Sequence, residues 1–290
     1  TTQEGVEQSI FQEVHEKRFT LAGEAPICRG QLLADFGYLA NTPFAEAVLN
    51  GSYTPPPDAD PATVELFAVI ARIRASIPAD TTRSLITPQQ WKDYWRVVKE
   101  ETSSSESGLH FGHYKCGAAN DVISHYHAAR VTVVLAHGIA LSRWSRGLSI
   151  MLEKVLGVTL VTKLRTILLM EADFNATNKI VYWVRMMDNV RKHGLMPEEV
   201  FSEKNRMADD GTLAKTLFYD ITQQARIPAG IGSVDASNCY DRIAHAIASL
   251  VFQACGVELS AIDSMLGAIQ RMKFFLRTGF GDSKSFAGGK

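Results

Sequence analysis

Cysteine, net charge and long apolar runs are all scarce in this sequence, and each shortage excludes a class of protein. The chain has only Cys28, Cys116, Cys239 and Cys255, which are too far apart for a zinc knuckle, so a reduced intracellular compartment is expected. The longest uncharged apolar run, Ile243–Val257, is too short to cross a bilayer, so no membrane partner is predicted. A net charge of −1 and a pI of about 6.7 do not fit a simple electrostatic binder of nucleic acid.

The charge that is present is unevenly distributed. Residues 1–70 carry ten acidic and three basic side chains, a net −7. Residues 141–170 carry five basic side chains and one acidic one, a net +4, and residues 265–290 have the same balance. A polyanion would therefore bind the second half of the chain rather than the first.

Length and periodicity indicate a globular protein of one or two domains built mostly from helices. The proline-rich stretch 54–61 is predicted as a linker. Thr87 is expected to cap a helix whose first turn contains Pro88. We expect a helical N-terminal region over residues 1–100 and a second region over 101–290. The fold class predicted is α+β, dominated by helices, with a small antiparallel sheet.

Two further long helices are expected in the middle of the chain. Residues 119–145 form a mostly apolar helical pattern. Asp173 and the two residues after it are expected to cap a helix that runs from Ala176 toward His193. Gly194 is expected to end that helix.

Basic residues cluster on a predicted β-hairpin. Its two strands are expected at Leu148–Val155 and Val158–Leu169, separated by a glycine. Pairing of the strands would aim Lys154, Lys163 and Arg165 into a common groove. The guanidinium fork and the ammonium groups would bind the phosphates of a nucleoside triphosphate there. The alternative is that these bases lie on an ordinary solvated face.

The most informative stretch runs from Gly230 to Ile243. Its glycines and small polar residues predict a short strand, Asp235 at the end of the strand, a tight turn and then a helix. A carboxylate at the end of a strand, beside backbone carbonyl oxygens, suits Mg²⁺ or Mn²⁺. The alternative is an ordinary strand-to-helix turn in which Asp235 serves as a cap.

This stretch follows the pattern Asp-x-x-x-small-aromatic-Asp. Asp235 occupies the first position, and the last three are Cys239, Tyr240 and Asp241. The pattern resembles motif A of reverse transcriptases, the RNA-directed DNA polymerases, of the non-LTR retrotransposon and group II intron type. Other segments resemble elements of the same family in the same order: the Ser- and Gly-rich loop 101–115, the strand Leu164–Leu169, Lys179-Ile180 and the turn Glu203–Thr212. The resemblance covers residues 101–290, although Glu106 and Thr166 stand where the family commonly has Pro.

The resemblance implies the fingers and the start of the palm of an incomplete right-hand polymerase. It implies two-metal nucleotidyl transfer, with an RNA or DNA template-primer and a deoxynucleoside triphosphate as partners. Asp235 would be catalytic and would bind metal, the backbone carbonyl of Ala236 would add a ligand, and Tyr240 would exclude a 2′-hydroxyl. The phosphates would be bound by Lys154, Lys163 and Arg165.

The family's Gln-Gly-rich motif B and Tyr-x-Asp-Asp motif C do not occur in these 290 residues. The sequence also begins without Met and ends on Gly288-Gly289-Lys290. We therefore expect an N-terminal fragment of a polymerase, inactive by itself, from a parent protein in the nucleus or cytoplasm.

Two alternatives stay open. One is a non-catalytic helical scaffold or interaction domain, a decayed piece of a retroelement. The other is a metal hydrolase that uses Asp235, Asp241 and a histidine. The hydrolase requires all three groups to lie within ligand distance of one ion.

Overall fold

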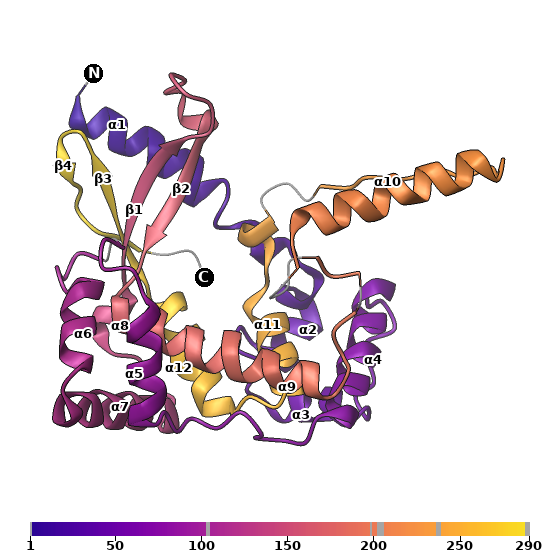
Figure 1. The fold of residues 1–290 in the computed structure, drawn as a ribbon, viewed down its shortest axis with the longest axis horizontal. Coiled ribbons are helices and arrows are strands. Elements are labelled where there is room, and N and C mark those ends of the chain that lie inside the picture. Colours follow the sequence, from indigo (N-terminus) through magenta and orange to yellow (C-terminus); the bar gives the residue numbers. More distant parts are fainter. Residues whose placement is uncertain (1, 103–104, 198, 202–205, 236–238, 288–290) are drawn as a thin grey trace.

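The computed structural model of the chain describes residues 2–102, 105–197, 199–201, 206–235 and 239–287. Helices make up most of these residues, and a small sheet stands above one side of the helical body (Figure 1). The helix-dominated α+β class is confirmed.

The helix expected after Thr87 begins at the predicted residue, whereas the helix expected over residues 119–145 covers only Asp121–Ala136. At α5 (Pro88–Val97) the Thr87 hydroxyl accepts from the backbone N of Gln90 at 3.2 Å, and the Gln90 side chain accepts from the Thr87 N at 3.0 Å. This is the predicted cap. The other α-helices are α1 (Gln3–Ile10), α2 (Gly30–Phe36), α3 (Pro43–Leu49), α4 (Pro61–Ser76), α6 (Phe111–Ala118), α7 (Asp121–Ala136), α8 (Ala172–Asn178), α9 (Met187–Lys192), α10 (Ala208–Gln224), α11 (His245–Ala254) and α12 (Leu259–Gln270).

The helix expected to begin at Ala176 starts earlier and is longer. α8 and α9 are joined without a break by the π-helical segment Lys179–Met186, and Gly194 follows with a φ of 65°. The expected cap at Asp173 is wrong. Asp173 lies inside the first turn. Its side chain is fully buried and accepts hydrogen bonds from other elements instead of capping the helix.

The predicted hairpin forms. β1 (Arg146–Glu153) and β2 (Leu164–Leu169) pair antiparallel, with Leu152 opposite Arg165. The expectation of a purely antiparallel sheet is wrong, since β1 also pairs in parallel with β3 (Lys273–Thr278). The short connection between β1 and β2 favours antiparallel pairing, whereas β1 and β3 are separated by a long, mostly helical crossover that permits the parallel arrangement. The other edge of β3 pairs with two short strands, β4 (Gly281–Asp282) and β5 (Phe286–Ala287).

The strand expected before Asp235 is absent from the described chain, and residues 227–235 form an extended coil. A strand needs a partner for its backbone groups, and in the described residues none pairs with this segment. Val234 is 97% exposed, so side-chain burial does not hold the segment to a sheet either.

Three hydrophobic clusters hold the fold together. The largest lies among α5–α9 and α12 and contains Trp91 and Trp95, both fully buried. The second packs α2, α3 and α4 against α11, with Phe36 and Leu250 at its centre. The third lies between the N-terminal helix and the sheet and includes Val14. The first hundred residues therefore contact both the sheet and the later helices.

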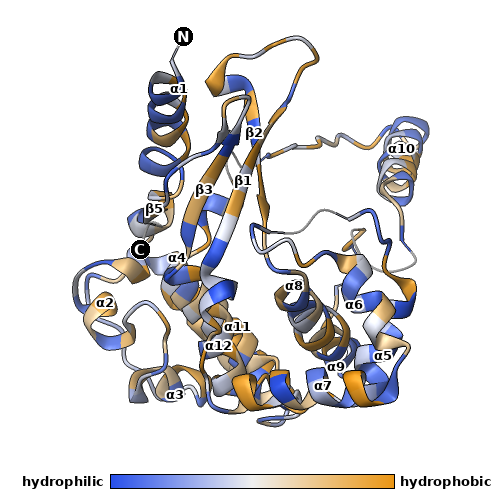
Figure 2. Ribbon diagram, turned by 90° about the vertical axis from the view of Figure 1, so that its left-hand side faces the viewer, coloured by the Kyte–Doolittle hydropathy of each residue, from blue (hydrophilic) through white to orange (hydrophobic). Residues whose placement is uncertain are grey.

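Helix α10 stands apart from these clusters. None of its described residues is buried, and it projects from the body of the molecule in the views of Figures 1 and 2.

In the described part of the chain, no helix is both long enough and apolar enough to cross a membrane.

Candidate functional site

A cavity of about 1040 Å³ lies beside the hairpin. Its walls come from four parts of the chain that are distant in sequence. These are the N-terminal segment 18–38, the β1–β2 hairpin, Asp235 with the described residues 239–245, and the residues at the end of α12 and the start of β3. The fold thus gathers basic and acidic side chains around one space.

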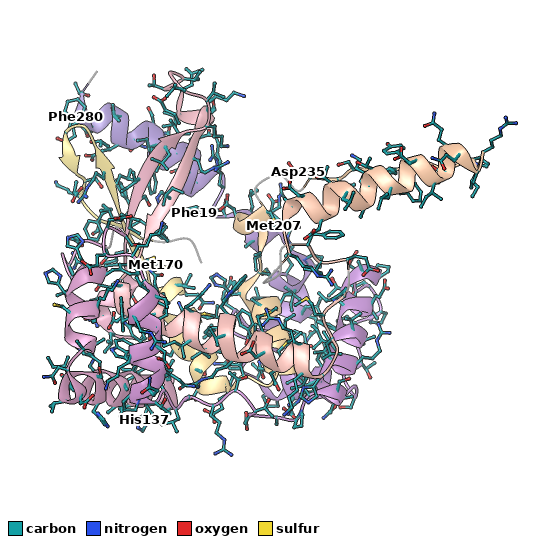
Figure 3. All side chains as sticks on the ribbon, viewed as in Figure 1. Phe19, His137, Met170, Met207, Asp235 and Phe280 are labelled. Carbon is teal, nitrogen blue, oxygen red and sulfur yellow. The ribbon has the colours of Figure 1, made fainter. Side chains whose placement is uncertain are left out.

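Three of the predicted site residues line this cavity: Asp235, Lys154 and Arg165. Asp235 is exposed and lies on the coil that follows α10. Figure 3 labels it near the inner end of α10, and labels another lining residue, Phe19, nearer to the sheet. A carboxylate and two cations predicted from separate motifs therefore share one space.

The hairpin positions its two cations by ordinary backbone pairing. Lys154 directly follows β1, and its backbone N donates to the carbonyl of Lys163 at 3.1 Å. The turn between the strands is fixed by Glu153, whose Oε2 accepts from the backbone N of Gly157 at 2.7 Å. Arg165 is the second residue of β2 and is exposed.

Lys163 differs from its two basic neighbours. It ends the short 3₁₀ turn Val161–Lys163, and its side chain is exposed. It is not one of the described residues that line the cavity. The expected common groove of three hairpin cations is therefore reduced to two.

The remaining predicted site residues lie partly outside the described chain. Ala236 falls in the undescribed stretch 236–238. Tyr240 belongs to the 3₁₀ turn Cys239–Arg242, but its side chain is not among those described. The expected roles of Ala236 as a metal ligand and of Tyr240 beneath the sugar stay predictions.

The cavity is also lined by titratable residues other than the predicted phosphate-binding cations. Asp241 is partly buried, and burial raises the pKa of its carboxyl, while the nearby charges of Arg18 and Lys154 lower it. His245 lies at the start of α11, where burial lowers its pKa and favours the neutral ring. Arg18 had no signal in the sequence, because it follows an amphipathic helical stretch whose charges are typical of a solvated face.

The described side chains do not complete a metal site. In the ranges that the structure covers, no group of three His, Cys, Asp or Glu side chains lies close enough together to hold an ion. Asp235, Asp241 and His245 line the same cavity without forming such a group. The described residues therefore lack the arrangement that a hydrolase centred on these three would need.

The Ser- and Gly-rich loop lies at the base of the sheet and not in the cavity. It ends sooner than expected, since α6 begins at Phe111. Glu106 accepts from Arg146 at the start of β1, with Nε and Nη2 at 2.8 and 2.7 Å. Ser105 donates to the buried carboxylate of Glu171. The described part of the loop is thus tied to the strand that leads to Lys154.

No protein-family model matches this chain, and no curated protein matches it either. Its function must therefore be inferred from the chemistry of the cavity and from the sequence.

Proposed function

We propose that this chain is the fingers and the first part of the palm of an RNA-directed DNA polymerase similar to non-LTR reverse transcriptases, and that the cavity receives the triphosphate of the incoming nucleotide. The observation that carries the proposal is the position of Asp235, Lys154 and Arg165 around one cavity. The motif that contains Asp235 and the hairpin that contains Lys154 and Arg165 are far apart in the sequence. A chance resemblance would not require their side chains to line the same cavity.

The chemistry of the wall suits phosphate. Arg165 offers planar paired donors that match two phosphate oxygens, and Lys154 adds a compact charge. Both belong to a paired hairpin, so their backbones are held in place before a ligand binds. This reduces the ordering entropy lost on binding.

Asp235 would repel a triphosphate that entered alone, because both are anionic. We therefore keep Mg²⁺ or Mn²⁺ as the proposed cofactor, with Asp235 as one ligand. Such an ion would offset the charge between carboxylate and phosphates.

We expect the 290-residue chain to bind nucleotide without extending a primer. Two-metal transfer needs several carboxylates near the reacting phosphate, and the described residues do not gather such a set. Steady primer extension by the isolated chain, abolished by Asp235→Ala, would contradict this expectation.

Isothermal titration with a deoxynucleoside triphosphate and Mg²⁺ tests the proposed site. Arg165→Gln is expected to weaken binding about tenfold or more, since hydrogen bonds to charged groups contribute about 1.5–3 kcal/mol. Lys163→Gln is the matched control, because it removes an exposed cation two residues away that does not line the cavity. Equal loss in both variants, or no binding by the wild-type chain, would refute the proposal.

One observation favours the non-catalytic scaffold as a second candidate. Helix α10 exposes Leu213, Phe218 and Ile221 by 58%, 43% and 61%. Apolar side chains gathered on a projecting helix are typical of a protein-contact surface. A scaffold would not need the cavity cations, so the same titration separates the two candidates.

A further inference from the structure

The N-terminal segment brings a third cation to the cavity. Arg18 follows the π-helical segment Phe11–Glu16, and its side chain is only 12% exposed. It lines the cavity together with Lys154 and Arg165. A guanidinium so far removed from water needs partners, because charged side chains are rarely buried unpaired.

The segment is fixed to the sheet by aromatic packing. The rings of His15 and Phe19 pack against Phe274 of β3, with centroid separations of 4.8 and 5.4 Å. Arg18 Nη1 donates to the carbonyl of Leu164 at 3.5 Å. Because Leu164 immediately precedes Arg165, this contact ties Arg18 to the strand that carries the predicted phosphate ligand.

The partners of Arg18 leave much of its guanidinium free. Besides the Leu164 carbonyl, Arg18 contacts Glu13 through Nη2 at 3.3 Å, and both hydrogen bonds are long. A guanidinium has five N–H donors. Among the described residues, three of these five have no acceptor within hydrogen-bonding distance.

Arg18 shares the cavity with the acidic side chain of Asp241. Arg18 and Lys154 are the two cations whose charges lower the pKa of the partly buried Asp241. The 3₁₀ turn Leu21–Glu24 lies against the turn Cys239–Arg242, so the N-terminal segment also contacts the stretch that holds Asp241. Arg18 is therefore close both to the hairpin, through Leu164, and to the turn that carries Asp241.

We propose that Arg18 is a phosphate-binding residue that acts with Lys154 and Arg165, so that the N-terminal segment is part of the nucleotide site. This inference rests on the function proposed above. It assigns a role to a region that the sequence motifs left unassigned. Its free N–H donors would take phosphate oxygens, and its contact with Leu164 would align them with those of Arg165.

Titration of the 290-residue chain with a deoxynucleoside triphosphate and Mg²⁺ tests the inference. Arg18→Gln is expected to weaken binding about tenfold, and Arg18→Lys to recover part of the loss because the charge is kept. Lys17→Gln is the matched control. Lys17 also pairs with Glu13, at 2.9 Å, but is 69% exposed and does not line the cavity, so its loss should leave affinity unchanged.

Glu13→Gln provides a second test that leaves Arg18 in place. It removes the carboxylate that competes for Arg18 Nη2, so triphosphate affinity should rise severalfold if Arg18 binds phosphate. Unchanged or weaker binding would assign Arg18 a purely structural role. If Arg18→Gln binds like the wild type while Arg165→Gln does not, the inference fails and the proposed function stands. If the wild-type chain does not bind triphosphate, both fail.

Discussion

Asp173 and Trp144 are joined by a hydrogen bond of 2.9 Å between the indole Nε1 and the carboxylate Oδ1, and neither side chain reaches the surface. The other oxygen of Asp173 accepts from Arg130 Nη2 at 2.9 Å and from Arg143. Arg143 also donates to the buried Glu171 at 2.8 Å. Two carboxylates and two guanidinium groups thus join α7, α8 and the 3₁₀ turn Ser142–Ser145 that precedes β1.

Asp173→Asn is expected to destabilise the protein by about 3–5 kcal/mol, because it leaves two largely buried guanidinium groups without their shared anion. The free energy of unfolding from denaturant titration measures this. Asp209→Asn, an exposed carboxylate on α10, is the control and should change stability by about 0.5 kcal/mol or less. Equal effects of the two substitutions would contradict the structural role given to Asp173.

The burial of His15 predicts that the docking of the N-terminal helix depends on pH. The side chain is 4% exposed, neither ring nitrogen has a hydrogen-bond partner among the described residues, and burial lowers its pKa to about 4. The unfolded value is about 6.5. The folded state therefore disfavours the proton. The stabilisation is complete above about pH 6.5 and falls as the pH drops toward 4, by about 3 kcal/mol in all.

Replacement of His15 by Phe should remove this part of the pH dependence, and denaturation at several pH values between 4 and 7 measures it. His137→Gln is the control, since His137 is exposed and lies on the far side of the helical body from the sheet (Figure 3). An unchanged pH profile in His15→Phe would show that the ring is solvated.

Two glycines with nearly the same φ should respond differently to alanine. Gly256 has a φ of +82° and Gly157 a φ of +80°. A Cβ at Gly256 would meet Ile77 Cγ2 and the Pro78 carbonyl, each at 3.0 Å, and would overlap Thr81 Oγ1, whereas a Cβ at Gly157 meets nothing within 4 Å.

Gly157→Ala should therefore show the backbone cost alone, about 1–2 kcal/mol. Gly256→Ala should lower the free energy of unfolding by roughly 1–3 kcal/mol more than this, because the added Cβ would overpack the site. Thermal and denaturant unfolding of the two variants measure the difference. Equal losses would mean that the segment around Pro78 moves aside.

The elements that could be predicted from the sequence are those set by local chemistry. The cap at Thr87 follows from a hydroxyl before a proline-initiated turn, and the basic hairpin follows from two β-rich runs around a glycine. The α8–α9 helix is predicted to exist, but it begins at Ala172 rather than Ala176. The role of Asp173 is missed, because a carboxylate near a helix start looks like a cap whatever its distant partners are.

What could not be predicted depends on contacts between distant segments. The parallel pairing of β1 with β3 and the docking of Arg18 beside the hairpin both join residues separated by more than a hundred positions. The coil before Asp235 has a composition that suits a strand, but among the described residues no strand pairs with it.

Hydrogen exchange of the backbone amides, with and without Mg²⁺ and a deoxynucleoside triphosphate, tests the central claim most directly. If Asp235, Lys154 and Arg165 form one nucleotide site, residues 146–169 and 227–245 should gain protection together, and Arg165→Gln should abolish the gain in both. Exchange that stays unchanged in both segments, or that changes only in distant helices such as α7, would contradict the account.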